Sequence, residues 1–153
     1  MKVNTHDHQG GLAALPDVLR QEIESAVAAC AIAPARGAAS SIGDAIMAAL
    51  NKEGWSGAVA LAGRASKISI TSMKKEAGLC MQTGGNMSRM YADLLKLQHM
   101  FLSNTINVGA MIAPSHAAAK KLGDNLVNAD RLGRELDIFR KVIHMPLVVF
   151  AFD

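Results

Sequence analysis

Two stretches of mostly apolar residues limit how this chain can fold. Residues 106–113 (INVGAMIA) and 146–152 (PLVVFAF) carry apolar side chains at consecutive positions rather than at alternate ones. A strand of this kind is typical of a sheet that is covered on both faces by helices. The intervening segments 87–102 and 115–139 repeat their apolar side chains at helical spacing. Strands separated by helices therefore predict an α/β domain with a mixed sheet between two helical layers.

The first half of the chain predicts two helices and then three short strands. Pro16 and Asp17 suit the first turn of a helix, and Pro34 ends that segment. A second helix follows and stops at Gly54. Three short segments with apolar or alternating sequences then predict strands at residues 57–62, 67–71 and 77–82. The last two of these strands are expected to form a hairpin.

Residues 1–15 are mostly polar at their start and contain two adjacent glycines, so we expect a flexible N-terminal arm. Residues 16–153 are then a single domain, which is the usual content of a chain of this length. No apolar run approaches the ~20 residues of a membrane span, and the polar start does not resemble a signal peptide. The two cysteines, Cys30 and Cys80, are too few for a disulfide framework. These features predict a cytoplasmic protein without a membrane partner.

Positive charge is concentrated in the middle of the chain. Residues 64–96 carry a net charge of +4, against −2 for residues 1–63 and +1 for residues 97–153. An anionic partner would meet the protein in this middle segment. The alternative is a basic surface that contacts only solvent.

The middle segment also contains a strand, a tight turn and the longest predicted helix. The strand ends at Gln82, glycines precede Asn86, and the helix opens with Ser88 and Arg89. A helix N-terminus offers free N–H groups to a phosphate, and an arginine there adds a bidentate contact. The alternative is a purely structural turn, with Asn86 as the N-cap and Arg89 paired to Asp93.

This segment resembles the type II restriction endonucleases of the BglII and BstYI kind, in the PD-(D/E)xK nuclease class. Cys80-Met81-Gln82 stands where the family has Glu-x-Gln, Gly85-Asn86 matches its turn, and Asp93-Leu94-Leu95-Lys96-Leu97 matches its helix. Three later stretches are also similar to the family: residues 108–114, 122–125 and 146–149. The resemblance therefore covers about residues 55–153.

The resemblance implies a restriction-endonuclease-like fold, with a central mixed sheet of about five strands flanked by helices. It also implies a homodimer that binds double-stranded DNA, because a two-fold symmetric site needs a two-fold symmetric protein. Phosphates would contact Lys74, Lys75, Arg89 and Lys96, with Asn86 and Ser88 beside them in the turn and first helical turn.

The active-site positions of the family are only partly filled. Its two Mg²⁺-binding acids align with Thr71 and Cys80, while Gln82 stands at the lysine position of the class motif. Mg²⁺ prefers oxygen ligands, usually with carboxylates among them, and a thiol is a poor substitute. We therefore expect a DNA-binding relative with no cofactor, in which hydrolysis is lost or reduced.

Two alternatives remain open at this point. The protein is an active Mg²⁺-dependent endonuclease if other carboxylates, of which Glu24 and Asp93 are the candidates, replace the missing pair. It is a non-catalytic scaffold that binds another protein if the surface around the family's active-site positions is apolar rather than basic.

Overall fold

The computed structural model describes residues 1–61 and 67–153, and its centre is a five-stranded mixed sheet. The strands lie in the order β1-β7-β6-β5-β4, with β5, β6 and β7 parallel to one another. Strands β1 and β4 are antiparallel to their neighbours and form the two edges. The bounds are β1 Val3–His8, β4 Ser72–Lys74, β5 Ala77–Met81, β6 Val108–Pro114 and β7 Leu147–Phe152. The predicted sheet of about five strands is confirmed.

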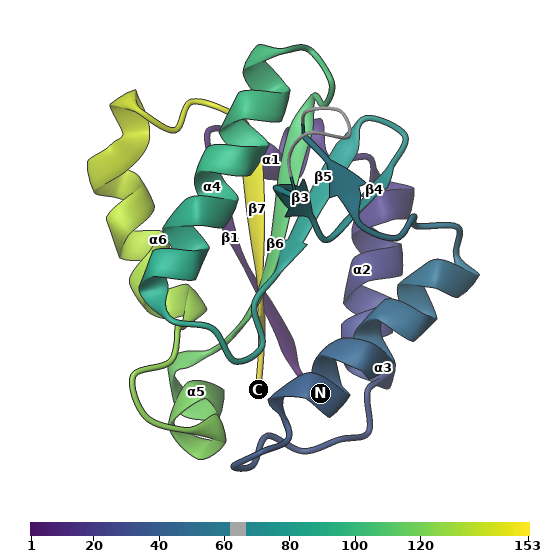
Figure 1. Ribbon diagram of the computed structural model, residues 1–153, viewed down its shortest axis with the longest axis vertical. Helices are drawn as coiled ribbons and strands as arrows, with labels where there is room; N and C mark the ends of the chain where they lie inside the picture. The colour runs from purple at the N-terminus through teal and green to yellow at the C-terminus, as the bar shows by residue number, and fades with distance from the viewer. Residues whose placement is uncertain (62–66) are drawn as a thin grey trace.

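Helices cover both faces of this sheet (Figure 1). One core contains side chains of α2 (Asp17–Ala29), α3 (Ala39–Lys52) and α5 (His116–Leu122). The other contains side chains of α4 (Met87–Leu102) and α6 (Ala129–Ile138). Strand β6 supplies Ala110 and Ile112 to the first core and Met111 and Ala113 to the second. A one-turn helix α1 (Gly11–Ala14) and a 3-10 turn η1 (Phe139–Lys141) complete these layers.

Residues 3–8, expected within a flexible arm, instead form the edge strand β1. Its backbone pairs with β7 from Val3–Phe152 to His8–Leu147. The side chain of His8 is buried, and its Nε2 lies 2.7 Å from the carbonyl oxygen of Ile143. An edge strand is held by main-chain hydrogen bonds and exposes much of its surface, so polar side chains are compatible with it. The polar composition therefore concealed a strand.

The predicted hairpin forms with a shifted boundary. Strand β4 pairs with β5, whereas β3 (Ser69–Ile70) pairs with β2 (Val59–Ala60) in a separate two-stranded sheet. Thr71 lies between β3 and β4. Residue 62, the end of the predicted strand 57–62, lies outside the described residues, as does Arg64 of the basic segment. Within the described ranges, no helix combines the length and apolar composition needed to cross a membrane.

Candidate functional site

The candidate site lies where β5 ends and the chain turns into α4. The carboxyl ends of the three parallel strands lie at one edge of the sheet, together with the C-terminus of the chain (Figure 1). Such an edge is the usual location of ligand sites in open α/β sheets. Gln82 follows β5 directly, and its backbone N–H donates to the carbonyl of Ile112 on β6 at 2.9 Å. The sheet therefore fixes the start of the turn.

Thr71 and Cys80 lie side by side at this edge. The pairing of Ser72 with Leu79 brings the two residues next to each other. The backbone N–H of Thr71 donates to the carbonyl of Leu79 at 3.0 Å, and the Thr71 hydroxyl oxygen accepts from the N–H of Met81 at 3.0 Å. The Thr71 hydroxyl is thus already engaged by the neighbouring strand.

Cys80 is fully buried, and its thiol is neutral at physiological pH. Burial raises the pKa of Cys80 to about 12, and the nearby negative charge of Asp93 adds to the increase. A hydrogen bond from Thr71 and the positive charge of Lys96 lower the pKa, but by less. A nucleophilic or metal-binding cysteine must be a thiolate. Cys80 therefore provides neither a nucleophile nor a negative charge.

Asp93 is a buried carboxylate whose two oxygens both accept hydrogen bonds. Lys96 Nζ lies 2.7 Å from Oδ1, and the side-chain amide nitrogen of Gln82 lies 2.5 Å from Oδ2. The charges of Asp93 and Lys96 both act on Cys80. Gln82, Asp93, Lys96 and Cys80 therefore form one cluster, here called the β5–α4 cluster.

The turn that leads into α4 depends on small residues. A Cβ on Gly85 would lie 2.2 Å from the side-chain oxygen of Gln82, and one on Gly84 would lie 2.8 Å from the Cβ of Ala39. The side-chain oxygen of Asn86 accepts from the backbone N–H of Arg89 at 3.2 Å. The N-cap interpretation of Asn86 is therefore confirmed. Close packing at Gly85 keeps the side chain of Gln82 next to the turn.

The charged side chains of α4 differ from the predicted pairing. Asp93 pairs with Lys96 at i+3 instead of with Arg89 at i−4. Arg89 is exposed and forms no ion pair with any residue that the structure describes, and Ser88 is exposed beside it. Arg89, Asp93 and Lys96 share one face of the helix because their spacing is i, i+4 and i+7. Two cations thus flank the buried carboxylate along this face.

The two hairpin lysines lie at the other end of β4 and β5. Lys74 pairs with Ala77, three residues from Thr71, which is roughly 10 Å along a strand. Lys74 Nζ lies 2.6 Å from a Glu22 oxygen and 2.5 Å from the carbonyl of Glu53. Lys75 is exposed in the turn. The structure therefore brings neither lysine to the β5–α4 cluster.

The donor set of the cluster does not fit a divalent cation. Cys80 is a neutral thiol, the Thr71 hydroxyl is engaged, and both oxygens of Asp93 already accept hydrogen bonds. Glu24 is half-buried on α2, and no hydrogen bond or ion pair joins it to the cluster. In residues 1–61 and 67–153, no three His, Cys, Asp or Glu side chains gather as metal ligands.

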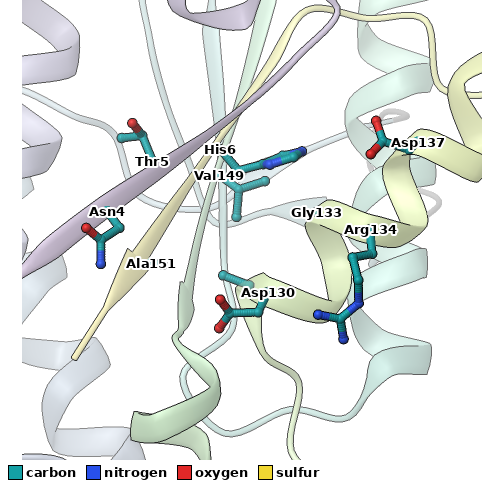
Figure 2. Close-up of a pocket in the computed structure, with 10 residues that line it drawn as sticks. Asn4, Thr5, His6, Asp130, Gly133, Arg134, Asp137, Val149 and Ala151 are labelled. Atoms are coloured by element: carbon teal, nitrogen blue, oxygen red, sulfur yellow. The ribbon is translucent and has the colours of Figure 1, made fainter.

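A separate pocket of about 300 Å³ lies between β1 and α6 (Figure 2). Val149 of β7, His6 of β1, and Asp130, Arg134 and Asp137 of α6 are among its lining residues. The charges that line the pocket are mixed, and Asp130 already accepts from the backbone N–H of His116. None of its lining residues belongs to the β5–α4 cluster, so the two places are distinct.

Sequence reasoning found the members of the cluster but not their contacts. Gln82, Asp93 and Lys96 were each singled out, whereas the hydrogen bond between Gln82 and Asp93 was not. The i, i+3 spacing of Asp93 and Lys96 is a local signal that predicts their ion pair. The ion pair between Glu22 and Lys74 crosses 52 positions in sequence and has no such signal.

The chain is thus an α/β domain with a mixed sheet between two helical layers and a polar cluster where a strand turns into a long helix. The family model described as restriction endonuclease BglII/BglIII matches residues 3–152, so the chain belongs to this family. The predicted family and fold are confirmed.

Two solved structures have the same fold. One is titled as restriction endonuclease BglII complexed with a DNA 16-mer, with a TM-score of 0.87 and 14% identity, covering 100% of this chain and 78% of the other. The second is titled as free BglII, with a TM-score of 0.79 and 13% identity, covering 100% of this chain and 80% of the other. No curated protein matches the sequence.

Proposed function

We propose that this chain is a duplex-DNA-binding member of the BglII family in which metal-dependent phosphodiester hydrolysis is lost or much reduced. One observation carries the proposal. At the end of β5, where the resemblance aligns the metal-binding acids, stand the engaged hydroxyl of Thr71 and the buried neutral thiol of Cys80. Neither supplies the charge that would hold Mg²⁺.

The first turn of α4 supports the DNA-binding half of the proposal. Asn86 caps the helix, while Ser88 and Arg89 are exposed at its N-terminal end. A phosphate there meets a positive helix end and a guanidinium that no described residue neutralises. The BglII structure whose title names a DNA 16-mer has the same fold. Lys75 adds positive charge at the hairpin turn. Lys74 forms an ion pair with Glu22, so we give it a structural role rather than a DNA contact.

A second copy of the chain is the proposed partner for an exposed apolar strip on α4 and the η1 region. Leu95 and Leu102 of α4 are more than half exposed, as is Val142 after η1. Two-fold symmetric DNA requires two copies, and an isologous contact uses the same patch on both. Light scattering tests this: we expect twice the monomer mass for the wild type and the monomer mass for Leu95→Glu. A monomeric wild type would contradict the proposed dimer.

DNA binding is tested by titrating a fluorescent duplex at two salt concentrations. For three phosphate contacts, affinity falls about 40-fold between roughly 50 and 200 mM salt. Arg89→Ala removes one contact and lowers the slope of log Kd against log salt by about 0.9. Arg20→Ala on α2, whose side chain is paired with Asp17, is the matched control. Absence of binding at low salt would overturn the proposal and favour the protein-binding scaffold.

Asp93 favours a second candidate function, an active endonuclease with a relocated carboxylate. It is buried beside Gln82, the residue that the resemblance aligns with the class lysine. Incubation of plasmid DNA with Mg²⁺ or Mn²⁺ decides between the two functions. The principal proposal predicts intact plasmid. Cleavage that disappears in Asp93→Ala and persists in Glu24→Ala would establish the second candidate instead.

A further inference from the structure

The ion pair of the β5–α4 cluster presents its cation, rather than its anion, toward solvent. The side chain of Asp93 is 5% exposed and that of Lys96 is 26% exposed, with 2.7 Å between Oδ1 and Nζ. An ammonium group has three donors. Asp93 accepts from one of them, and no other acceptor for Lys96 occurs among the described residues. Of the two charged side chains, that of Lys96 is therefore the more accessible to an anion from solvent.

The cluster is balanced in charge without any added ion. Asp93 carries one negative charge, Lys96 carries one positive charge, and the Cys80 thiol is neutral. The Gln82 amide and the Lys96 ammonium each contact one oxygen of Asp93, so a divalent cation would compete with both for this carboxylate. A divalent cation beside the ammonium would place two positively charged groups against one buried negative charge, which is unfavourable.

We propose that Lys96, held by Asp93, is a resident cation that contacts a DNA phosphate, so that the protein binds duplex DNA without a divalent metal ion. This inference rests on the DNA binding proposed above and adds its cation requirement. Arg89 lies on the same face of α4, two turns before Lys96, and supplies a second positive group for the same strand of DNA. Gln82 and Asp93 act as positioning residues for the ammonium.

The wild-type protein provides the first test, and it involves no variant that could fail to fold. Duplex DNA is titrated in EDTA and in Mg²⁺ at matched ionic strength. We expect dissociation constants that agree within about twofold, because the positive charge is already present. DNA binding that requires Mg²⁺ would overturn this inference and leave the proposed function standing. Absence of binding in both buffers would overturn the proposed function itself.

The second test removes the resident cation. Lys96→Gln leaves the Asp93 carboxylate uncompensated, so we expect at least tenfold weaker binding in EDTA and a partial recovery when Mg²⁺ is added. Lys96→Arg keeps the charge and should bind in EDTA within about threefold of the wild type. Lys52→Gln, an exposed lysine at the end of α3, is the matched control with unchanged binding. Thermal melting of each variant confirms that the compared proteins are folded.

Lys96→Gln binding in EDTA that equals the wild type would overturn the inference. So would a loss of affinity that Mg²⁺ does not restore and that Lys96→Arg shares, because a purely structural role of Lys96 predicts that pattern.

Discussion

The β4–β5 hairpin has a lysine–carboxylate pair near each end, and the two pairs differ in what surrounds them. Near the hairpin turn, Lys74 and Glu22 are 2.6 Å apart, with side chains 19% and 13% exposed. Near the other end, Lys96 and Asp93 are 2.7 Å apart, but their exposures of 26% and 5% are unequal. Similar distances thus accompany different access to solvent.

Their hydrogen-bond partners explain the difference. Lys74 also donates to the carbonyl of Glu53, and Glu22 also accepts from the indole of Trp55 at 2.9 Å. This pair therefore connects α2, the end of α3 and β4, and its charged groups are already hydrogen-bonded within the protein. Among the residues that the structure describes, the ammonium of Lys96 has one partner, and it lies near the edge where the carboxyl ends of the parallel strands meet. We expect the number of partners, rather than the pair distance, to separate a structural pair from the proposed DNA-binding pair.

The largest expected effect is a loss of stability when the hairpin-turn pair is broken. Lys74→Gln leaves Glu22 mostly buried, with the Trp55 indole as its one remaining partner in the described part of the chain. We expect the free energy of unfolding to fall by about 3 kcal/mol, while DNA affinity of the folded protein stays the same. Urea unfolding measures the change, with the exposed Lys52→Gln as control. A change below about 0.5 kcal/mol, the usual range of surface substitutions, would show that this pair is not structural.

A smaller effect is expected when the β5–α4 cluster is disturbed without removing a charge. Gly85→Ala would place a methyl group 2.2 Å from the Gln82 side-chain oxygen and force that side chain away from Asp93. We expect DNA affinity to fall about tenfold, or about 1.4 kcal/mol. Gly57→Ala is the control, because nothing lies within 4 Å of its added Cβ. If Gly85→Ala and Gly57→Ala bound DNA equally well, the position of the Gln82 side chain would not matter for DNA binding.

The smallest effect concerns the pH dependence contributed by Cys80. The pKa of the folded thiol is about 12 and that of the unfolded thiol is near 9.0. The unfolded chain therefore loses its proton first, so this contribution to stability is present below pH 9 and is lost as pH rises. Between pH 8 and 9.5 the loss is about 0.8 kcal/mol. Urea unfolding of the wild type should show this extra slope relative to Cys80→Ala, and parallel pH profiles would contradict the burial of the thiol.

The sequence predicted the sheet where the strands are apolar and missed it where they are not. The apolar segments that form β6 and β7 place apolar side chains on both faces of the sheet, so both faces must be buried. Their predicted positions agree with the structure. The polar sequence of Val3–His8 carries no such signal, because its pairing with β7 depends on backbone hydrogen bonds. The hairpin boundary also differs from the prediction, since Thr71 lies between the residues that pair with β2 and those that pair with β5.

The candidate site was predictable as a set of residues and only partly as an arrangement. The predicted order of strand, turn and helix locates Gln82, Asn86 and Arg89 in the sequence. The residue type of Asn86 predicts its role as the N-cap. Lys74 was assigned to DNA from its charge, although Glu22, distant in sequence, occupies it. Local spacing predicts helix capping and i, i+3 pairs, whereas contacts between distant elements depend on tertiary packing.

The most direct test of the difference between the two pairs is the salt dependence of DNA binding by Lys96→Gln and Lys74→Gln. Log Kd is measured against log salt for both variants and the wild type in EDTA, on protein shown to be folded. Loss of one phosphate contact lowers the slope by about 0.9. We expect this decrease for Lys96→Gln and an unchanged slope for Lys74→Gln. An unchanged slope for Lys96→Gln, or an equal decrease for both variants, would contradict it.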